Sequence, residues 1–193
     1  MDTQLRRASG AELDLFYEWM RKQFHPGELK RLSHLHEMCA RGLYAAYGLW
    51  SGENLIAYAL LGNTPDGRYL LLDYYAVLPE HQDQGWGGRF LARLCETLSG
   101  EAMLLEVEDP RYMKDPAEAA HCERRIRFYE RAGCVHADAD LNLFGFDYTI
   151  MVLPMSAHPD DRQVRRALEQ IYHVYFPEKV YRANVHFRKI SEV

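Results

Sequence analysis

The chain has 193 residues, which is enough for one domain with a full hydrophobic core and too few for two large ones. Hydrophobic residues make up 48% and charged residues 26%, a composition that is typical of a globular protein and argues against disorder. The net charge of −5 and the scattered Lys and Arg residues argue against nucleic acid as a partner.

The sequence shows no feature of secretion or of membrane insertion. Its N-terminus lacks the apolar core of a signal peptide, and no run approaches the ~18 apolar residues of a transmembrane helix. The four cysteines are widely spaced without a Cys-x-x-Cys pair, which indicates buried free thiols in a reducing compartment. They are Cys39, Cys95, Cys122 and Cys134. We therefore expect a cytoplasmic protein with no membrane partner.

The first third of the chain predicts a strand and two helices. Residues 3–8 form a short strand, and Ser9 or Gly10 then caps a helix with Glu12 in its first turn. Four residues recur at helical spacing and should face the core: Leu13, Phe16, Tyr17 and Met20. A second helix is expected over residues 28–41.

The middle of the chain changes to β-strand character. Residues 43–50 and 55–62 flank a turn-rich connection over 51–54 and should pair as a hairpin. The run over residues 68–77 is almost continuously apolar and aromatic, which suits a central strand covered on both faces. A helix follows over residues 85–99.

The remaining elements complete a mixed α+β layer around one central sheet. A strand over residues 103–107 is followed by a loop over 109–116 and a helix over 117–132. Two strands over 134–137 and 148–153 should pair as a hairpin, and a last helix covers 160–175. An irregular tail then runs to Val193. Three roles are open for the tyrosine-rich stretch from Ile171 to Phe187, which could pack on the sheet, cover the acceptor cleft or make a homodimer contact.

The connection between the central strand and the next helix is rich in glycine. The strand turns at Pro79 and passes through Gln82, Gly85, Gly87 and Gly88 into the helix. Such a turn presents backbone N–H groups at the positive end of a helix dipole, which suits an anion and above all a phosphate. The glycine spacing is not that of a dinucleotide fingerprint and no Walker lysine follows, so an NTPase is disfavoured. The alternative is a plain strand–turn–helix connection.

Two further motifs stand in order with this turn. The strand ends in Tyr75-Ala76-Val77, the turn reads Gln82-Asp83-Gln84-Gly85-Trp86-Gly87-Gly88, and a later helix carries Phe128-Tyr129-Glu130-Arg131-Ala132-Gly133. With these motifs the chain resembles the GCN5-related N-acetyltransferase (GNAT) superfamily over residues 3–154. The resemblance implies a mixed central sheet, splayed between its fourth and fifth strands and flanked by helices. It makes residues 1–154 an acyltransferase domain and residues 155–193 a C-terminal helical extension packed on the same domain.

The resemblance implies acetyl-CoA as co-substrate and no metal. Backbone N–H groups from Asp83 to Gly88 would hold the pyrophosphate, and the backbone of the preceding strand would pair with the pantetheine arm. The cofactor-binding residues implied are Tyr75, Ala76, Val77, Gln82, Asp83, Gln84, Gly85, Trp86, Gly87 and Gly88. One departure is Asp83, because the family usually has a basic residue or glycine there, and an aspartate puts negative charge beside the phosphates.

Two side chains are implied as catalytic, Tyr129 and Glu106. In the family, a tyrosine at the place of Tyr129 protonates the departing thiolate of coenzyme A; the alternative is a core aromatic beside Phe128. The run Leu104-Leu105-Glu106-Val107 is similar to the Leu-Glu-Val strand of the subfamily that acetylates protein N-termini, where the glutamate is the general base. Glu108, Asp73 and a water relay are competing bases. Glu106 could instead pair with a cation such as Arg125.

A second departure concerns the acceptor side. That subfamily has an asparagine seven residues before the tyrosine, where this chain has Cys122, and its strand–helix connection is shorter than the one over residues 109–121. The longer loop should form a wall of the acceptor site, and the acceptor stays open between a small-molecule amine and a peptide amine. The arginines of the same helix are either solvated or paired with carboxylates, or they contact the 3′-phosphate of coenzyme A. They are Arg124, Arg125 and Arg127.

The motifs and the resemblance together predict an N-acetyltransferase in which a primary amine attacks the thioester directly. No Cys or Ser stands in a nucleophile context, so an acyl-enzyme has no candidate residue. The alternative is a non-catalytic acyl-CoA-binding or regulatory module on the same fold. His34, His36 and Glu37 lack the spacing of a metal site and should lie on a solvated helix face.

Overall fold

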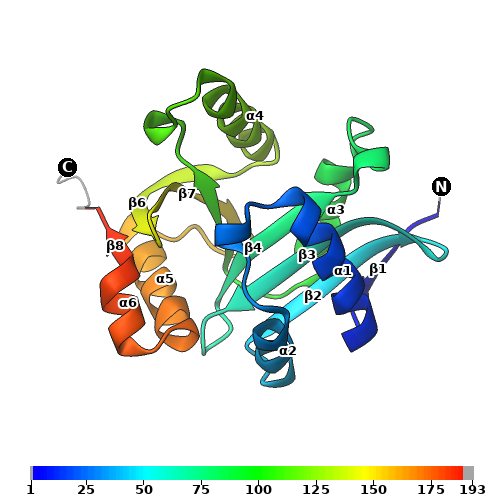
Figure 1. Ribbon diagram of the computed structural model, residues 1–193, viewed down its shortest axis with the longest axis horizontal. Helices are drawn as coiled ribbons and strands as arrows, with labels where there is room; N and C mark the ends of the chain where they lie inside the picture. The colour runs from blue at the N-terminus through cyan, green and yellow to red at the C-terminus, as the bar shows by residue number, and fades with distance from the viewer. Residues whose placement is uncertain (1, 189–193) are drawn as a thin grey trace. The chain divides into compact units, whose positions relative to one another are not determined.

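The computed structural model describes residues 2–188, drawn in Figure 1. Its helices are α1 (Gly10–Gln23), α2 (Leu32–Ala40), α3 (Trp86–Thr97), α4 (Pro116–Arg131), α5 (Asp161–Tyr175) and α6 (Glu178–Asn184). Its strands are β1 (Gln4–Arg7), β2 (Tyr44–Ser51), β3 (Asn54–Asn63), β4 (Tyr69–Val77), β5 (Ala102–Glu108), β6 (Val135–Leu143), β7 (Phe146–Pro154) and β8 (Val185–Phe187). Short 3-10 turns cover Pro26–Glu28, Pro79–His81 and Pro110–Tyr112.

The strands described form one mixed sheet in the order β1-β2-β3-β4-β5-β7-β6-β8. β4 and β5 run parallel and are joined through α3, whereas β1-β2-β3 and β5-β7-β6-β8 are antiparallel. This arrangement confirms the predicted α+β class and the interior position of the apolar strand over residues 68–77. The splay between the fourth and fifth strands stays a prediction.

The chain divides into two compact units. Unit 1 comprises residues up to 62 together with 72–98, and unit 2 comprises residues 63–71 together with those from 99 onward. β4 therefore contributes its first residues to unit 2 and the rest to unit 1.

Unit 1 has a core of aromatic and aliphatic side chains between α1 and the strands. Ser9, one of the two predicted caps, forms a capping box with Glu12, which fixes the start of α1. Phe16 then stacks on Tyr58 with ring centroids 5.4 Å apart and lies 6.2 Å from the ring of Trp50. Of the four residues predicted to face the core, Leu13, Phe16 and Met20 are buried and Tyr17 is half-buried. The predicted hairpin between β2 and β3 is confirmed, with Ser51 opposite Asn54.

The second helix begins later than predicted, at Leu32 rather than at residue 28. The Tyr74 hydroxyl donates to the Glu28 carbonyl at 2.6 Å and accepts from the Lys30 backbone N–H at 3.0 Å. These bonds hold the segment against β4, so Leu29 and Arg31 stay extended and the helix starts after them. The prediction was wrong here because helical periodicity does not reveal a contact 44 residues away.

Unit 2 is built on β5, β6, β7 and β8 with α4 and α5. The predicted β6–β7 hairpin is confirmed, although both strands are longer than predicted, and its register shifts between Ala137 and Leu141. α5 packs against β6 and buries one face of the helix: Val164, Ala167, Leu168, Ile171, Tyr172 and Tyr175. β8 adds to the edge of β6. Of the roles left open for the tail, packing on the sheet is therefore observed.

The tail after Pro177 is more regular than predicted. Pro177 caps α6 instead of ending the regular structure, since proline fits the start of a helix. Val185–Phe187 then forms β8, whose short length leaves little sequence signal. Residues 189–193, which the prediction also included in the irregular tail, lie outside the described part of the chain.

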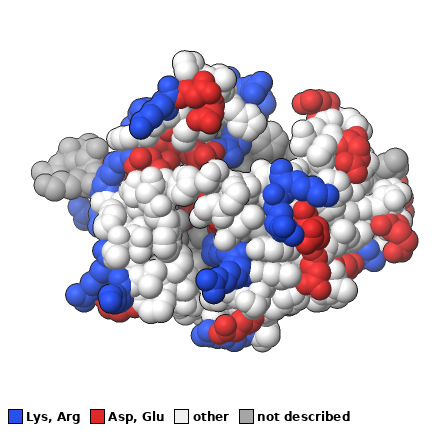
Figure 2. Space-filling view, viewed as in Figure 1, with Lys and Arg blue, Asp and Glu red and all other residues white. Residues whose placement is uncertain are grey.

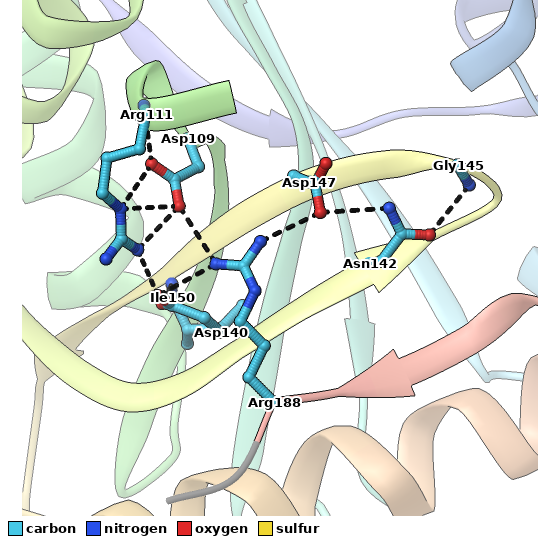
Figure 3. Close-up of polar contacts among 8 residues, drawn as sticks. All are labelled: Asp109, Arg111, Asp140, Asn142, Gly145, Asp147, Ile150 and Arg188. Atoms are coloured by element: carbon cyan, nitrogen blue, oxygen red, sulfur yellow. Dashed lines mark hydrogen bonds and ion pairs between the residues drawn. The ribbon is translucent and has the colours of Figure 1, made fainter. Parts of the chain in front are cut away.

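A cluster of aspartates and arginines ties the end of β8 to the β6–β7 hairpin and to the loop after β5 (Figure 3). Asp109 is 1% exposed and binds the Arg111 guanidinium with contacts of 2.6 to 3.0 Å. Arg188 reaches Asp109 at 3.2 Å, Asp140 at 3.5 Å and Asp147 at 2.9 Å. Two guanidinium groups thus compensate three carboxylates of which one is fully buried.

Asp109→Asn is expected to lower the free energy of unfolding by about 2 kcal/mol at pH 7, because the buried charge-assisted bonds are lost while both arginines keep another carboxylate. Burial acts to raise the pKa of Asp109, but the bonds from Arg111 and Arg188 outweigh it and hold the pKa below its usual value. A lowered carboxyl pKa gives stability that is present above pH ~4 and is lost on further acidification. Urea denaturation at pH 7 and at about pH 3 measures both effects.

The exposed Asp2→Asn is the matched control for this prediction, since it removes the same charge without a buried partner. Its stability should stay within about 0.5 kcal/mol of the wild type. If the free energy of unfolding differs between the wild type and Asp109→Asn by the same amount at both pH values, the stabilisation does not come from the ionised carboxylate of Asp109.

Candidate functional site

The glycine turn of unit 1 opens α3 as predicted. Gly85 is the N-cap of the helix, has a left-handed backbone (φ 78°, ψ 5°) and no side-chain capping bond. The first helical bond runs from the Arg89 N–H to the Gly85 carbonyl at 3.3 Å, so the N–H groups of residues 86–88 have no acceptor within the helix. A Cβ added at Gly85 or Gly88 would meet nothing within 4 Å. The turn therefore presents N–H donors beside open space, as an anion requires.

Asp83 is the unusual residue of this turn. Its side chain is exposed and its backbone is left-handed, with φ 58°. Aspartate tolerates this conformation better than most residues, whereas glycine adopts it without strain. The conformation thus explains why glycine suits this position, and the exposed side chain can turn its charge toward solvent.

Side chains join the end of β4 to the turn and to α3. The amides of Gln23 and Gln82 both donate to the Val77 carbonyl, at 3.0 and 3.1 Å. The Tyr75 hydroxyl donates to the Gly87 carbonyl, and its ring stacks on Phe90 with centroids 5.3 Å apart. These contacts fix the turn relative to the strand. They also mean that the Val77 carbonyl, one of the groups assigned to pantetheine, already accepts two hydrogen bonds.

Asp73, one of the three carboxylates weighed as a general base, lies in unit 1. Its side chain is 8% exposed, and its Oδ2 lies 2.5 Å from the Lys30 ammonium. The Tyr44 hydroxyl donates to the same oxygen. Both contacts engage Asp73 Oδ2, so this nearly buried carboxylate already serves as a partner within unit 1.

The other two carboxylates, Glu106 and Glu108, lie on β5 in unit 2. Arg125 binds Glu108 through its Nη2, so the cation weighed as a partner of Glu106 contacts its neighbour on the strand instead. The Tyr172 hydroxyl of α5 donates to Glu106 Oε1. Glu106 is half-buried and so keeps part of its surface accessible.

Cys122, which stands where an asparagine is usual, lies within the Glu108–Arg125 pair. Its buried Sγ is 3.9 Å from Glu108 Oε2 and 3.8 Å from Arg125 Nη2. Arg127 pairs with Glu123 at 3.2 Å, and Arg124 lies 3.2 Å from the His121 ring. Pairing with carboxylates, one of the two alternatives weighed for the arginines of α4, is thus observed for Arg125 and Arg127.

Tyr129 lies in the last turn of α4. It is half-buried, and its ring meets that of Phe128 edge-on with centroids 5.0 Å apart. Burial raises the pKa of Tyr129 to about 12, although Arg125 one turn earlier acts in the opposite direction. The hydroxyl therefore keeps its proton throughout the physiological range and is a hydrogen-bond donor there.

Sequence reasoning missed Tyr172 and Lys30. The helical periodicity of α5 could have indicated that Tyr172 faces the core, but no sequence signal links it to Glu106, 66 residues earlier. Lys30 falls within the helix predicted over residues 28–41, whereas it lies before α2 and binds Asp73.

The described residues show no metal site and no membrane-spanning element. No group of three or more His, Cys, Asp or Glu side chains within residues 2–188 is arranged to hold a metal ion. His36 pairs with Asp14 at 2.7 Å and His34 lies 3.9 Å from Glu37. Within the same part of the chain, every helix is too short or too polar to cross a membrane. On the face drawn in Figure 2, the coloured Lys and Arg residues are interspersed with Asp and Glu.

Solved structures of known proteins share this fold. A GNAT-family protein from Bacteroides thetaiotaomicron is 23% identical, with a TM-score of 0.68 over 89% of this chain and 94% of its own. A GNAT-family protein from Desulfovibrio desulfuricans is 25% identical, with a TM-score of 0.62 over 80% and 99%. The yncA protein of Salmonella typhimurium, solved with its cofactor acetyl-CoA, is 20% identical, with a TM-score of 0.58 over 82% and 97%.

A search of curated proteins gave no match to this chain. The sequence profile described as the Acetyltransferase (GNAT) family matches residues 13–134. That range includes the β4 strand, the glycine turn and Tyr129, which are the features described above. The chain therefore belongs to the GNAT acetyltransferase family.

Proposed function

We propose that the protein is an N-acetyltransferase that moves the acetyl group of acetyl-CoA to a primary amine by direct attack. The observation that carries this proposal is the left-handed Gly85 turn, which leaves the first N–H groups of α3 beside open space. Family membership supports the pyrophosphate of coenzyme A as the anion that this turn would bind.

The cofactor would be held mainly by backbone groups. The N–H groups from Asp83 to Gly88 would bind the pyrophosphate, with Gln82 keeping the turn attached to Val77. The backbone of Tyr75, Ala76 and Val77 would pair with pantetheine. Because two glutamines already occupy the Val77 carbonyl, the groups of Tyr75 and Ala76 are expected to contribute more of this pairing.

In the proposed reaction the amine first loses its extra proton to the base, then forms the N–C bond while the C–S bond breaks. The second nitrogen proton leaves to solvent, from which the departing thiolate is protonated. Glu106, directly or through a water, is the proposed base, because it lies on β5 with part of its side chain accessible. Tyr129 would donate a hydrogen bond to the departing thiolate. With a pKa of about 12 against ~8.5 for a thiol, complete proton transfer from Tyr129 is uphill by about 5 kcal/mol.

A steady-state assay with acetyl-CoA and a panel of small and peptide amines tests the proposal. Release of coenzyme A that depends on an added amine, with the acetylated amine found by mass spectrometry, is the expected result. Tight binding of acetyl-CoA without turnover of any amine would instead favour a non-catalytic acyl-CoA-binding module. Thermal protection by ATP but not by acetyl-CoA would favour neither the transferase nor the binding module, and it would contradict the assignment of acetyl-CoA as co-substrate.

Asp83→Gly is expected to tighten acetyl-CoA binding about fivefold. The substitution removes a negative charge beside the proposed pyrophosphate, on the order of 1 kcal/mol at an exposed site, and relieves a left-handed backbone. Titration calorimetry at low and high salt measures the change, and the gain should shrink as salt screens the charge. Asp83→Asn separates the two causes, because it removes the charge and keeps a side chain that tolerates the conformation. Unchanged affinity in both variants would place the phosphates elsewhere.

A further inference from the structure

We propose that Tyr172, on the helix that follows the family's shared elements, is a positioning residue for the base Glu106. Its hydroxyl holds the Glu106 carboxylate ionised and aimed in one direction. The inference rests on the proposed function for its catalytic meaning, but the hydrogen bond itself can be tested without turnover.

The contact joins two fixed groups. The Tyr172 hydroxyl donates to Glu106 Oε1, and the Tyr172 side chain is 1% exposed. A buried phenol needs an acceptor for its O–H, and an ionised carboxylate is a stronger acceptor than a neutral group. A donated bond stabilises the charged form of the carboxylate, which is the form that accepts a proton.

The tyrosine ring is held by the C-terminal part of unit 2. Phe176 and Phe187 lie against it with ring centroids 6.2 Å away in each case. Phe187 belongs to β8, which pairs with β6, and α5 starts at a capping box formed by Asp160 and Gln163. The position of the hydroxyl therefore depends on elements beyond residue 154.

The backbone of Glu106 is fixed as well. It stands opposite Ile150 in the β5–β7 ladder, with ladder pairs on both sides. Both ends of the hydrogen bond are thus carried by regular elements, which is the condition for a preorganised catalytic group.

Tyr172→Phe tests the proposal, since it removes the hydroxyl and keeps the ring that packs on Phe176 and Phe187. The titration of Glu106 is followed by carbon NMR of glutamate-labelled protein, with its signal identified by its loss in Glu106→Gln. The midpoint should rise by about one pH unit, and the acidic limb of the pH–rate profile should move with it. The turnover number should fall about tenfold, with the KM for acetyl-CoA within about twofold.

Two controls separate positioning from a general structural effect. Tyr181→Phe removes a hydroxyl from α6 of the same C-terminal part and keeps the ring stack on His173, so it should leave the midpoint and the rate unchanged. In a Glu106→Gln background, Tyr172→Phe should lower the rate no further.

An unchanged Glu106 midpoint in folded Tyr172→Phe overturns the proposal. A Tyr172→Phe protein that fails to fold also overturns it, because the hydroxyl would then serve the fold. A midpoint that shifts in a protein acetylating none of the amines would refute the proposed function while supporting the contact. If the wild type is active and the Glu106 midpoint does not shift in Tyr172→Phe, the positioning role is refuted and the proposed function stands.

Discussion

Gly87→Glu is expected to weaken acetyl-CoA binding at least about a hundredfold while the fold stays intact. The new carboxylate would stand in the first turn of α3, among the N–H donors proposed for the pyrophosphate, and would compete with it by charge and by size. The same carboxylate favours the helix, since a negative charge at its N-terminus adds about 0.3 to 1 kcal/mol. Titration calorimetry with acetyl-CoA and thermal unfolding measure the two effects.

Gly87→Gln is the matched control, because glutamine has nearly the same volume without the charge. It should weaken binding by a smaller factor than Gly87→Glu, and the difference between the two variants should shrink at high salt. Normal binding by Gly87→Glu would contradict the placement of the pyrophosphate. Lost binding together with a lowered melting temperature would trace the effect to the fold instead.

The fold was predictable where the signals are local to the chain. The capping residues Ser9 and Glu12 and the turn at Gly52 each act over a few residues, and each appears in the structure where the sequence predicted it. The start of α2 was not predictable, because it is set by Tyr74 on a strand more than 40 residues later.

The proposed site shows the same division. The strand, the turn and the helix that form the anion-binding geometry are consecutive in sequence, so their residue types were sufficient to predict them. The partners of the carboxylates are not consecutive. Strand periodicity places Glu106 and Glu108 on one face, but only the packing of α4 and α5 decides that Arg125 binds one and Tyr172 the other.

The pairing of the carboxylates also narrows the mechanism. Sequence alone favoured Glu106 as the base and left Glu108, Asp73 and a water relay as competitors. In the structure Lys30 binds Asp73 and Arg125 binds Glu108, while the Tyr172 hydroxyl donates to Glu106. The proposed reaction therefore needs Tyr129 only on the side of the leaving sulfur.

Tyr129→Phe is expected to lower the turnover number about ten- to a hundredfold, with little change in acetyl-CoA affinity. With its pKa raised to about 12 by burial, the phenol cannot easily give up its proton to a thiolate, so its contribution is that of one hydrogen bond to a developing charge. Such a bond is made only as the C–S bond breaks, which affects the rate and not ground-state binding. Steady-state kinetics of the wild type and the variant measure this loss.

The pH dependence tests the same assignment with a defined sign. A raised pKa keeps Tyr129 protonated below pH ~11, so the pH–rate profiles of the wild type and of Tyr129→Phe should have the same shape and differ only in height. Tyr17→Phe, which removes a half-buried hydroxyl from α1, should leave both rate and profile unchanged. An alkaline limb near pH 9 that disappears in Tyr129→Phe would show a tyrosine that titrates during the reaction, and an unchanged turnover number would remove Tyr129 from the mechanism.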